Sequence, residues 1–224
     1  MKAQNSLPGT ARFSLRPIAS LRSLALGAVA ATMLVGGMPP AASAMLDLCP
    51  DEPLEGCLSA GKTTVRITNP RNAERRRLTV RFNNAEAARK PLFGDPSEDT
   101  GYAVCIYDYA SGMPGLAYVA ELPASPDWTE PINTPGWRYD DFLGENHGFI
   151  FGRLVPSRTS GRSKVSLRAR EENVPEVVPF SSSRMMAIDQ QLDAQVVNTL
   201  GTCWSGTVFG SEVNRKRSFK ATGY

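Results

Sequence analysis

The stretch Lys164-Val165-Ser166-Leu167-Arg168-Ala169-Arg170 decides the fold class of this 224-residue chain. Val165, Leu167 and Ala169 alternate with charged and hydroxyl side chains. A period of two is that of a β-strand with one face toward a core and the other toward water, as antiparallel sheets allow. The stretch therefore predicts a half-buried strand of an antiparallel sheet.

The same alternation recurs at residues 63–68 and 77–82, where apolar side chains alternate with threonine and arginine. Turn-forming pairs such as Asn69-Pro70 and Ser160-Gly161 separate the apolar runs. About ten short strands with such punctuation predict an all-β fold, an antiparallel β-sandwich or barrel. The further strand candidates are residues 102–109, 116–122, 137–140, 149–155, 194–200, 203–209 and 218–221.

Two segments depart from the strand pattern. Residues 84–90 have a helix-forming composition that begins with an asparagine, which predicts one or two helical turns. Residues 183–191 are ambiguous, because Ser183 can cap a helix there but the run is brief. The proline-rich residues 123–135 predict an ordered loop without regular structure.

The first 44 residues have the pattern of a secretory signal peptide. Three arginines precede an apolar run at residues 24–35, and the small residues Ala42-Ser43-Ala44 follow it. The run is shorter than the roughly 20 residues that a membrane-spanning helix needs. We therefore expect an exported protein, secreted or periplasmic, with residues 1–44 removed, residues 45–224 as a single β domain and no membrane span after cleavage.

Removal of the signal peptide changes the electrostatic interpretation. The chain has 25 Lys and Arg against 22 Asp and Glu, and residues 1–44 hold four of the cations and none of the acids. The remaining chain has a formal charge of −1, so its composition gives no argument for nucleic acid or an anionic membrane as a partner. The clusters Arg75-Arg76-Arg77 and Arg215-Lys216-Arg217 are predicted to be solvated edges, since charge on an edge strand blocks unwanted strand pairing.

Cys49, Cys57, Cys105 and Cys203 form an even set, which predicts disulfides in an exported chain. Four cysteines allow three pairings. We favour a local bridge between Cys49 and Cys57 within the proline-rich start of the mature chain. The second favoured bridge, between Cys105 and Cys203, would join two predicted strands. The spacings lack the short paired ligands of structural zinc sites, and the sequence predicts neither a metal nor another cofactor.

Catalytic motifs are scarce. The chain has one histidine, His147, and no serine or cysteine in a recognisable nucleophile motif that it could activate as a base. We therefore interpret His147 as a turn residue beside a strand. Asp140, Asp141 and Glu145 crowd a turn after a predicted strand. Such carboxylates can bind Ca²⁺ or act as the acid and base of a glycosidase, but a solvated hairpin tip is the favoured interpretation.

The three tryptophans raise a binding hypothesis. Trp128 lies in the proline-rich segment, Trp137 follows it, and Trp204 follows a cysteine. Sugar rings stack on exposed indoles, so a carbohydrate-binding surface is one alternative. We expect Trp204 in the core, since burial of a large indole contributes strongly to stability, and take Trp128 as the best candidate for an exposed aromatic.

Several short motifs carry a resemblance to a known module. They are Gly136-Trp137-Arg138-Tyr139-Asp140-Asp141, Arg153-Leu154-Val155-Pro156, the strand at 164–170, and Gly201-Thr202-Cys203-Trp204-Ser205-Gly206 with Phe219-Lys220-Ala221. The chain resembles an uncharacterised secreted all-β module of deltaproteobacteria and myxobacteria, from which it departs in a longer proline-rich insert and an arginine-rich strand at 164–170. The resemblance implies a bacterial, secreted all-β protein and no activity.

The sequence thus predicts an exported, non-enzymatic binding or structural β module. Loops at the sheet ends would contact a partner such as a glycan or an envelope protein, and no nucleic acid is expected. The alternatives are a secreted, glycosidase-like hydrolase that uses the clustered carboxylates, and a carbohydrate-binding module. The candidate binding residues are Trp128, Asp140, Asp141 and Glu145.

Overall fold

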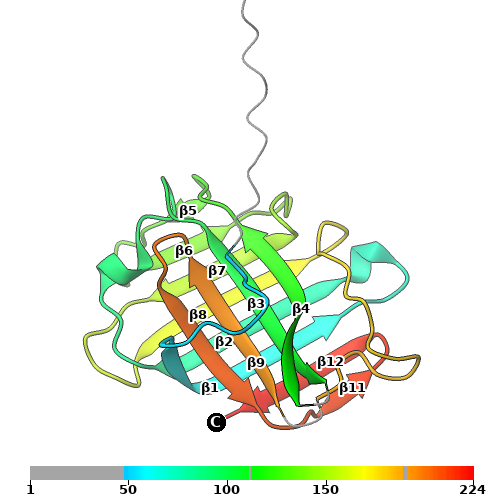
Figure 1. Cartoon of the computed structure of the whole chain (residues 1–224). Helices are drawn as coiled ribbons and strands as arrows, with labels where there is room; N and C mark the ends of the chain where they lie inside the picture. The colour runs from blue at the N-terminus through cyan, green and yellow to red at the C-terminus, as the bar shows by residue number, and fades with distance from the viewer. Residues whose placement is uncertain (1–47, 111, 189–190) are drawn as a thin grey trace, which may run out of the picture. The chain divides into compact units, whose positions relative to one another are not determined.

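A computed structural model describes residues 48–110, 112–188 and 191–224 (Figure 1). The expected signal peptide lies outside these residues. The described part of the chain forms twelve strands and two short 3-10 turns, and it contains no α-helix. In the same part, no helix has the length and apolar character needed to cross a membrane. The predicted all-β class is confirmed.

Each segment that the sequence predicted as a strand contains one, although β9 and β10 end one or two residues early. Two short strands, β5 and β11, are added, and β5 lies within residues 123–135, which the sequence predicted to have no regular structure. The strands are β1 (Leu58–Thr68), β2 (Arg77–Ala85), β3 (Tyr102–Ala110), β4 (Met113–Leu122), β5 (Trp128–Thr129), β6 (Trp137–Asp140), β7 (Phe149–Val155), β8 (Ser163–Arg170), β9 (Leu192–Asn198), β10 (Cys203–Val208), β11 (Val213–Arg215) and β12 (Ser218–Gly223). The 3-10 turns are η1 (Ala73–Arg75) and η2 (Lys90–Phe93).

The alternation in β8 sorts its side chains as the sequence predicts. Val165, Leu167 and Ala169 are buried, whereas Lys164 and Arg168 are exposed. The same period in β1 and β2 gives each strand a buried face and a solvent face. The apolar faces together enclose one core, and their polar faces form the outer surface of the sheet.

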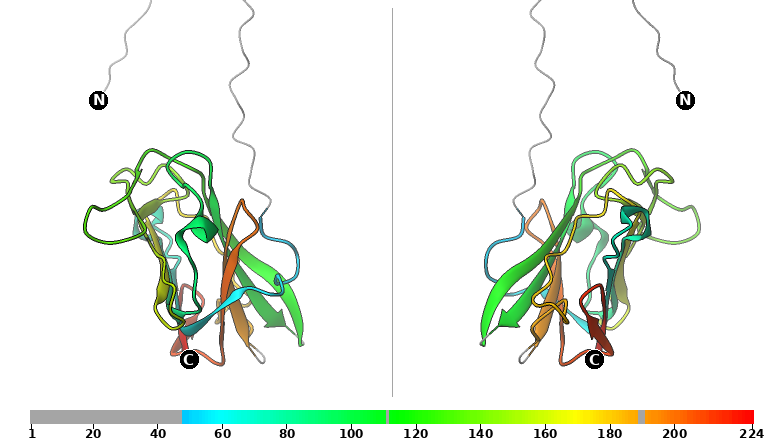
Figure 2. Two further views of the ribbon diagram at one scale, coloured as in Figure 1. Left: turned by 90° about the vertical axis from the view of Figure 1, so that its left-hand side faces the viewer. Right: turned by 90° about the vertical axis from the view of Figure 1, so that its right-hand side faces the viewer.

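All strands belong to one hydrogen-bonded sheet, in the order β4-β3-β9-β10-β1-β2-β8-β7-β6-β5, with β12 beside β1 and β11 beside β12. The β1–β10 ladder is parallel and short, with the pairs Leu58–Trp204 and Ser59–Ser205. The sheet is therefore mixed, whereas the sequence predicted a purely antiparallel one. It curls as a half-barrel, so that the β4-β3-β9-β10 half lies over the other half (Figure 2).

The helical interpretation of residues 84–90 is wrong. Asn84 and Ala85 extend β2, where Ala85 pairs with both Ala60 and Ser163, and the 3-10 turn begins only at Lys90. Pairing on both sides outweighs the local helical preference of these residues. Residues 183–188 form an irregular loop, and positions 189–190 lie outside the described residues.

All four cysteines form disulfides, but the predicted pairing is wrong. The bridges are Cys49–Cys105 and Cys57–Cys203. Strand β9 lies between β3 and β10, which separates Cys105 from Cys203 by two strand spacings, about 10 Å. That distance exceeds the reach of a disulfide. The N-terminal segment instead crosses the outside of β3 and β9 (Figure 1), where Cys49 meets Cys105.

Candidate functional site

The outer face formed by the neighbouring strands β1, β2, β8 and β7 is strongly basic. These four strands contain no aspartate or glutamate. Because alternate residues share a face, the cations of each strand point to the same outer surface. They are Lys62, Arg66, Arg77, Arg81, Arg153, Lys164, Arg168 and Arg170.

The strand register aligns these cations in rows across the sheet. In one row, Arg81 lies opposite Ser166, which lies opposite Arg153, which in turn lies opposite Arg138 of β6. In the adjacent row, Arg168 lies opposite Phe151. The rows therefore bring together side chains from four strands that span residues 77–170 of the sequence.

Two adjoining hollows open on this surface. One of about 280 Å³ lies between β6, β7 and the proline-rich loop and includes Trp137 and Arg138. The other, of about 320 Å³, lies over β2, β8 and β7. Both are lined by Phe151 and Arg153, so the two hollows adjoin at these residues and are treated together as one groove. We call it the arginine groove and define it by Arg81, Arg138, Phe151, Arg153, Lys164 and Arg168.

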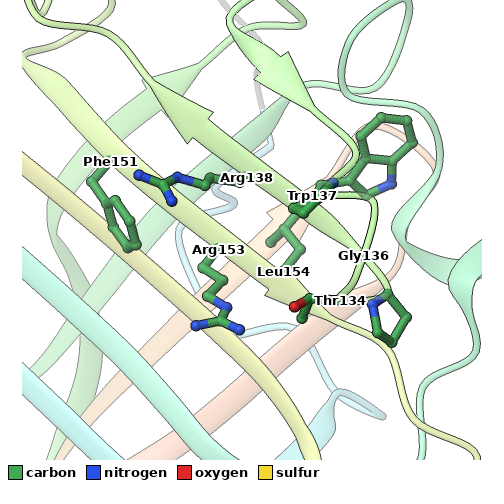
Figure 3. Close-up of a pocket in the computed structure, with 9 residues that line it drawn as sticks. Thr134, Gly136, Trp137, Arg138, Phe151, Arg153 and Leu154 are labelled. Atoms are coloured by element: carbon green, nitrogen blue, oxygen red, sulfur yellow. The ribbon is translucent and has the colours of Figure 1, made fainter.

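Figure 3 shows the first hollow, where Arg138 extends toward Phe151 and Arg153 lies beside them. Arg138 forms an ion pair with Asp140, with an Nε to Oδ2 distance of 2.5 Å, and this hydrogen bond raises the pKa of Arg138. Asp140 therefore neutralises one end of the groove. Neither hollow has a carboxylate in its lining.

The other cations of the groove lack a counter-charge. Within the described residues, Arg81, Arg153, Lys164 and Arg168 form no ion pair. The buried Nε of Arg81 has no hydrogen-bond partner there. Burial, and then repulsion by Arg168, lowers the pKa of Arg81. An anion in the groove would reduce this repulsion.

Neutral polar groups and two aromatic rings, Phe151 and the largely buried Trp137, complete the groove. Asn83 and Ser166 line the second hollow, and Thr134 lines the first. The guanidinium of Arg168 lies 5.0 Å from the centre of the Phe151 ring. Guanidinium groups bind planar or tetrahedral oxyanions through paired N–H donors, while the hydroxyl and amide groups can bond to neutral parts of a ligand.

The predicted carboxylate cluster lies where β6 ends, with Asp140 in the strand and Asp141 and Glu145 in the β6–β7 connection. The carboxylate of Asp141 accepts hydrogen bonds from the backbone N–H groups of Leu143 at 2.7 Å and Glu145 at 3.0 Å. Its neighbour Asp140 is bound to Arg138. Across the described part of the chain, no group of three or more Asp, Glu, His or Cys residues could hold a metal ion. These contacts support the interpretation as a solvated hairpin tip.

His147 lies in the same turn, two residues before the start of β7, as predicted for a turn residue beside a strand. Its Nδ1 accepts a hydrogen bond of 2.7 Å from the backbone N–H of Glu121 at the end of β4. The imidazole thus connects the turn to the other half of the sheet. Glu145, the third predicted acid, is exposed.

Trp128 is not an exposed aromatic, because its side chain is only 2% exposed. Its ring lies between those of Tyr102 and Tyr139, with centroid distances of 5.9 and 5.2 Å. Gly152 of β7 leaves room for the indole, since a Cβ there would lie 2.6 Å from it. The predicted stacking surface at Trp128 is therefore wrong, while the predicted burial of Trp204 is confirmed.

Sequence reasoning missed the arginine groove. It placed Lys164 and Arg168 on a solvent face but did not connect them with Arg81 or Arg153. One signal was available, since the segments that form β1, β2, β7 and β8 contain no acidic residue. The near-neutral net charge of residues 45–224 gave no sign that the basic and acidic residues lie on different strands and loops.

Comparisons with protein-family models, with curated proteins and with solved structures found no match to this chain. The resemblance to a secreted deltaproteobacterial module therefore stays a prediction.

Proposed function

We propose that this protein is an exported, non-enzymatic binding module whose arginine groove takes an acidic polysaccharide. The observation that carries the proposal is the acid-free outer face of four neighbouring strands, where seven of the eight cations form no ion pair in the described structure. Neighbouring like charges on a sheet repel one another. A ligand with repeated carboxylate or sulfate groups would offset that repulsion.

The types of side chain in the groove favour an acidic glycan over other anionic polymers. Arginine presents a planar fork that binds a carboxylate through two hydrogen bonds. Asn83, Ser166 and Thr134 lie between the cations and suit the hydroxyl groups of sugar rings. Base stacking on several exposed aromatic rings is the usual feature of single-stranded nucleic acid sites, whereas the groove has only Phe151 and Trp137, and Trp137 is 7% exposed.

The compartment that we propose is the periplasm or the cell exterior. Two disulfides suit an oxidising compartment, and the signal-peptide pattern of residues 1–44 favours export. The curled sheet encloses its core between two halves, and we regard it as a sandwich-like binding scaffold that presents one face to its ligand.

The contacts of the acidic residues support binding over glycoside hydrolysis. A glycosidase needs two available carboxyl groups on either side of the bond to be broken. The carboxylate of Asp140 is paired with Arg138, and that of Asp141 bonds to the backbone of its own turn. Neither one lines the arginine groove.

Calorimetric titration of the folded protein with polygalacturonate, and with neutral dextran as the comparison, tests the proposal. We expect binding of polygalacturonate that weakens with added salt and no binding of dextran. Arg153→Ser and Arg168→Ser should each weaken binding about tenfold, which corresponds to about 1.4 kcal/mol.

Arg75→Ser is the matched control, because Arg75 is exposed and lies outside the groove. This variant should bind within twofold of the unmodified protein. Equal losses in Arg75→Ser and Arg153→Ser would show non-specific attraction and overturn the proposal. Tighter binding of a single-stranded oligonucleotide than of polygalacturonate would overturn the choice of ligand.

A further inference from the structure

The two basic clusters of the sequence meet at a second cavity, away from the arginine groove. Arg76 comes from the first cluster, and Lys216 and Arg217 come from the second. All three line one cavity of about 340 Å³, together with Arg71. The arginine groove and this cavity have no lining residue in common.

Hydrogen bonds fix the segments that form this cavity. The backbone N–H of Asn69, at the end of β1, donates to the carbonyl of Arg217 at 3.0 Å. The Asn69 side-chain amide donates to the carbonyl of Val177 at 2.8 Å. Asn69 is 7% exposed. It therefore holds the β11–β12 turn and the 174–179 loop against the end of β1.

The cavity has an excess of positive charge. Four cations and one carboxylate, Glu176, line it. Glu176 binds the terminal Nη2 of Arg76 at 2.9 Å. The Nε of Arg76 is buried with no hydrogen-bond partner in the described structure, and within the same residues Arg71, Lys216 and Arg217 form no ion pair.

We propose that this cavity binds one tetrahedral oxyanion, a phosphate or sulfate group. Cations from the β1–β2 connection and from the β11–β12 turn surround the same space, and such an arrangement suits a compact group with several acceptor oxygens. A cavity of this volume has room for the anion and several waters. The shared chemistry covers both free phosphate and a phosphoryl end group on a larger molecule.

Titration with inorganic phosphate in a zwitterionic buffer, followed by the backbone amide signals of Asn69 and Arg217, tests the inference. We expect saturable shifts at these amides. Arg71→Ser and Lys216→Ser should each weaken phosphate binding about tenfold, while Arg75→Ser, an exposed neighbour that does not line the cavity, should stay within twofold. Thermal unfolding of each variant checks that the fold is retained.

Glycerol phosphate distinguishes the two sources of the anion. Binding as tight as that of inorganic phosphate would assign an end group as the ligand, and weaker binding would assign the free ion. The inference is overturned if no saturable shift occurs with either probe, or if Arg75→Ser loses as much affinity as Lys216→Ser. Arg153→Ser should leave phosphate binding unchanged. The phosphate-site proposal and the acidic-polysaccharide proposal can therefore be refuted independently of each other.

Discussion

Arg81 and Arg168 lie one diagonal step apart on the adjacent strands β2 and β8 and face the same side of the sheet, because Arg81 pairs with Ser166 and Thr79 with Arg168. Diagonal neighbours on a sheet are about 7–8 Å apart, within reach of long side chains. Repulsion from Arg168 adds to burial in lowering the pKa of Arg81. Two such groups without a carboxylate in the hollow suit the binding of an anion.

The Cys57–Cys203 bridge should contribute more stability than Cys49–Cys105. It closes 146 residues rather than 56, and the chain-entropy relation gives about 5 against about 4 kcal/mol. It also reinforces the two-pair β1–β10 ladder that joins the sheet halves. In urea unfolding, Cys57→Ser/Cys203→Ser should lose about 1 kcal/mol more than Cys49→Ser/Cys105→Ser. The reverse order would contradict this role.

Gly152→Ala should destabilise the fold by about 1–3 kcal/mol, the usual cost of overpacking. A Cβ at this position would lie 2.6 Å from the Trp128 ring and 2.9 Å from the Cβ of Tyr139. Gly115→Ala is the matched strand control, since its nearest neighbour is 4.0 Å away. Thermal unfolding measures both variants. Equal unfolding temperatures would refute the close packing of Trp128 against β7.

Two buried tyrosines should respond in opposite ways to removal of the hydroxyl group. The Tyr102 hydroxyl donates to the carbonyl of Phe93, whereas the buried Tyr118 hydroxyl has no partner within the described residues. Tyr102→Phe should cost about 0.5–1.5 kcal/mol, and Tyr118→Phe should be neutral or stabilising. Denaturant unfolding distinguishes them, and a larger loss for Tyr118→Phe would contradict this description.

Burial should also make stability fall at high pH. It raises the pKa of Tyr118 above the ordinary value of 10.0. As the pH rises, the unfolded chain releases the Tyr118 proton before the folded chain does. The contribution of Tyr118 to the free energy of unfolding is therefore complete below about pH 10 and is lost as the pH rises further. Denaturant unfolding between pH 9 and 12 should show a shallower decline for Tyr118→Phe. Identical slopes would contradict the assignment.

Asp108 should hold the loop that precedes β9. Its carboxylate accepts hydrogen bonds from the backbone N–H groups of Ala187 and, at 2.8 Å, Ile188. Asp108→Ala leaves both donors unpaired and should cost about 2–4 kcal/mol, whereas Asp108→Asn keeps one acceptor and should cost less. Hydrogen exchange at Ala187 and Ile188 is the measurement. Unchanged protection in Asp108→Ala would show that the loop does not depend on this carboxylate.

Local alternation is what made the strands predictable. In β8, Val165 and Leu167 each point inward and Arg168 points outward because a strand has a period of two. This rule needs no knowledge of the neighbours. Local composition was the weaker guide: it predicted a helix at residues 84–90, where Ala85 remains in β2 because β1 and β8 pair with it on both sides.

The groove and the disulfides depend on strand order, which alternation does not contain. Arg153 lies diagonally across from Arg168 only because β7 pairs with β8, and Cys203 bonds to Cys57 only because β10 runs parallel to β1. These neighbours are far apart in sequence or joined by loops of irregular length. Net charge was uninformative for the same reason, since the fold separates cations and acids that balance in composition.

The measurement that tests the central proposal most directly is a residue-by-residue NMR titration of the folded protein with oligogalacturonate. The arginine groove predicts saturable shifts of the backbone amides of Phe151, Arg153 and Ser166, with no comparable shifts in β3, β4 or β9. Shifts centred on β3, β4 or β9, or none at a saturating concentration, would contradict the proposed function.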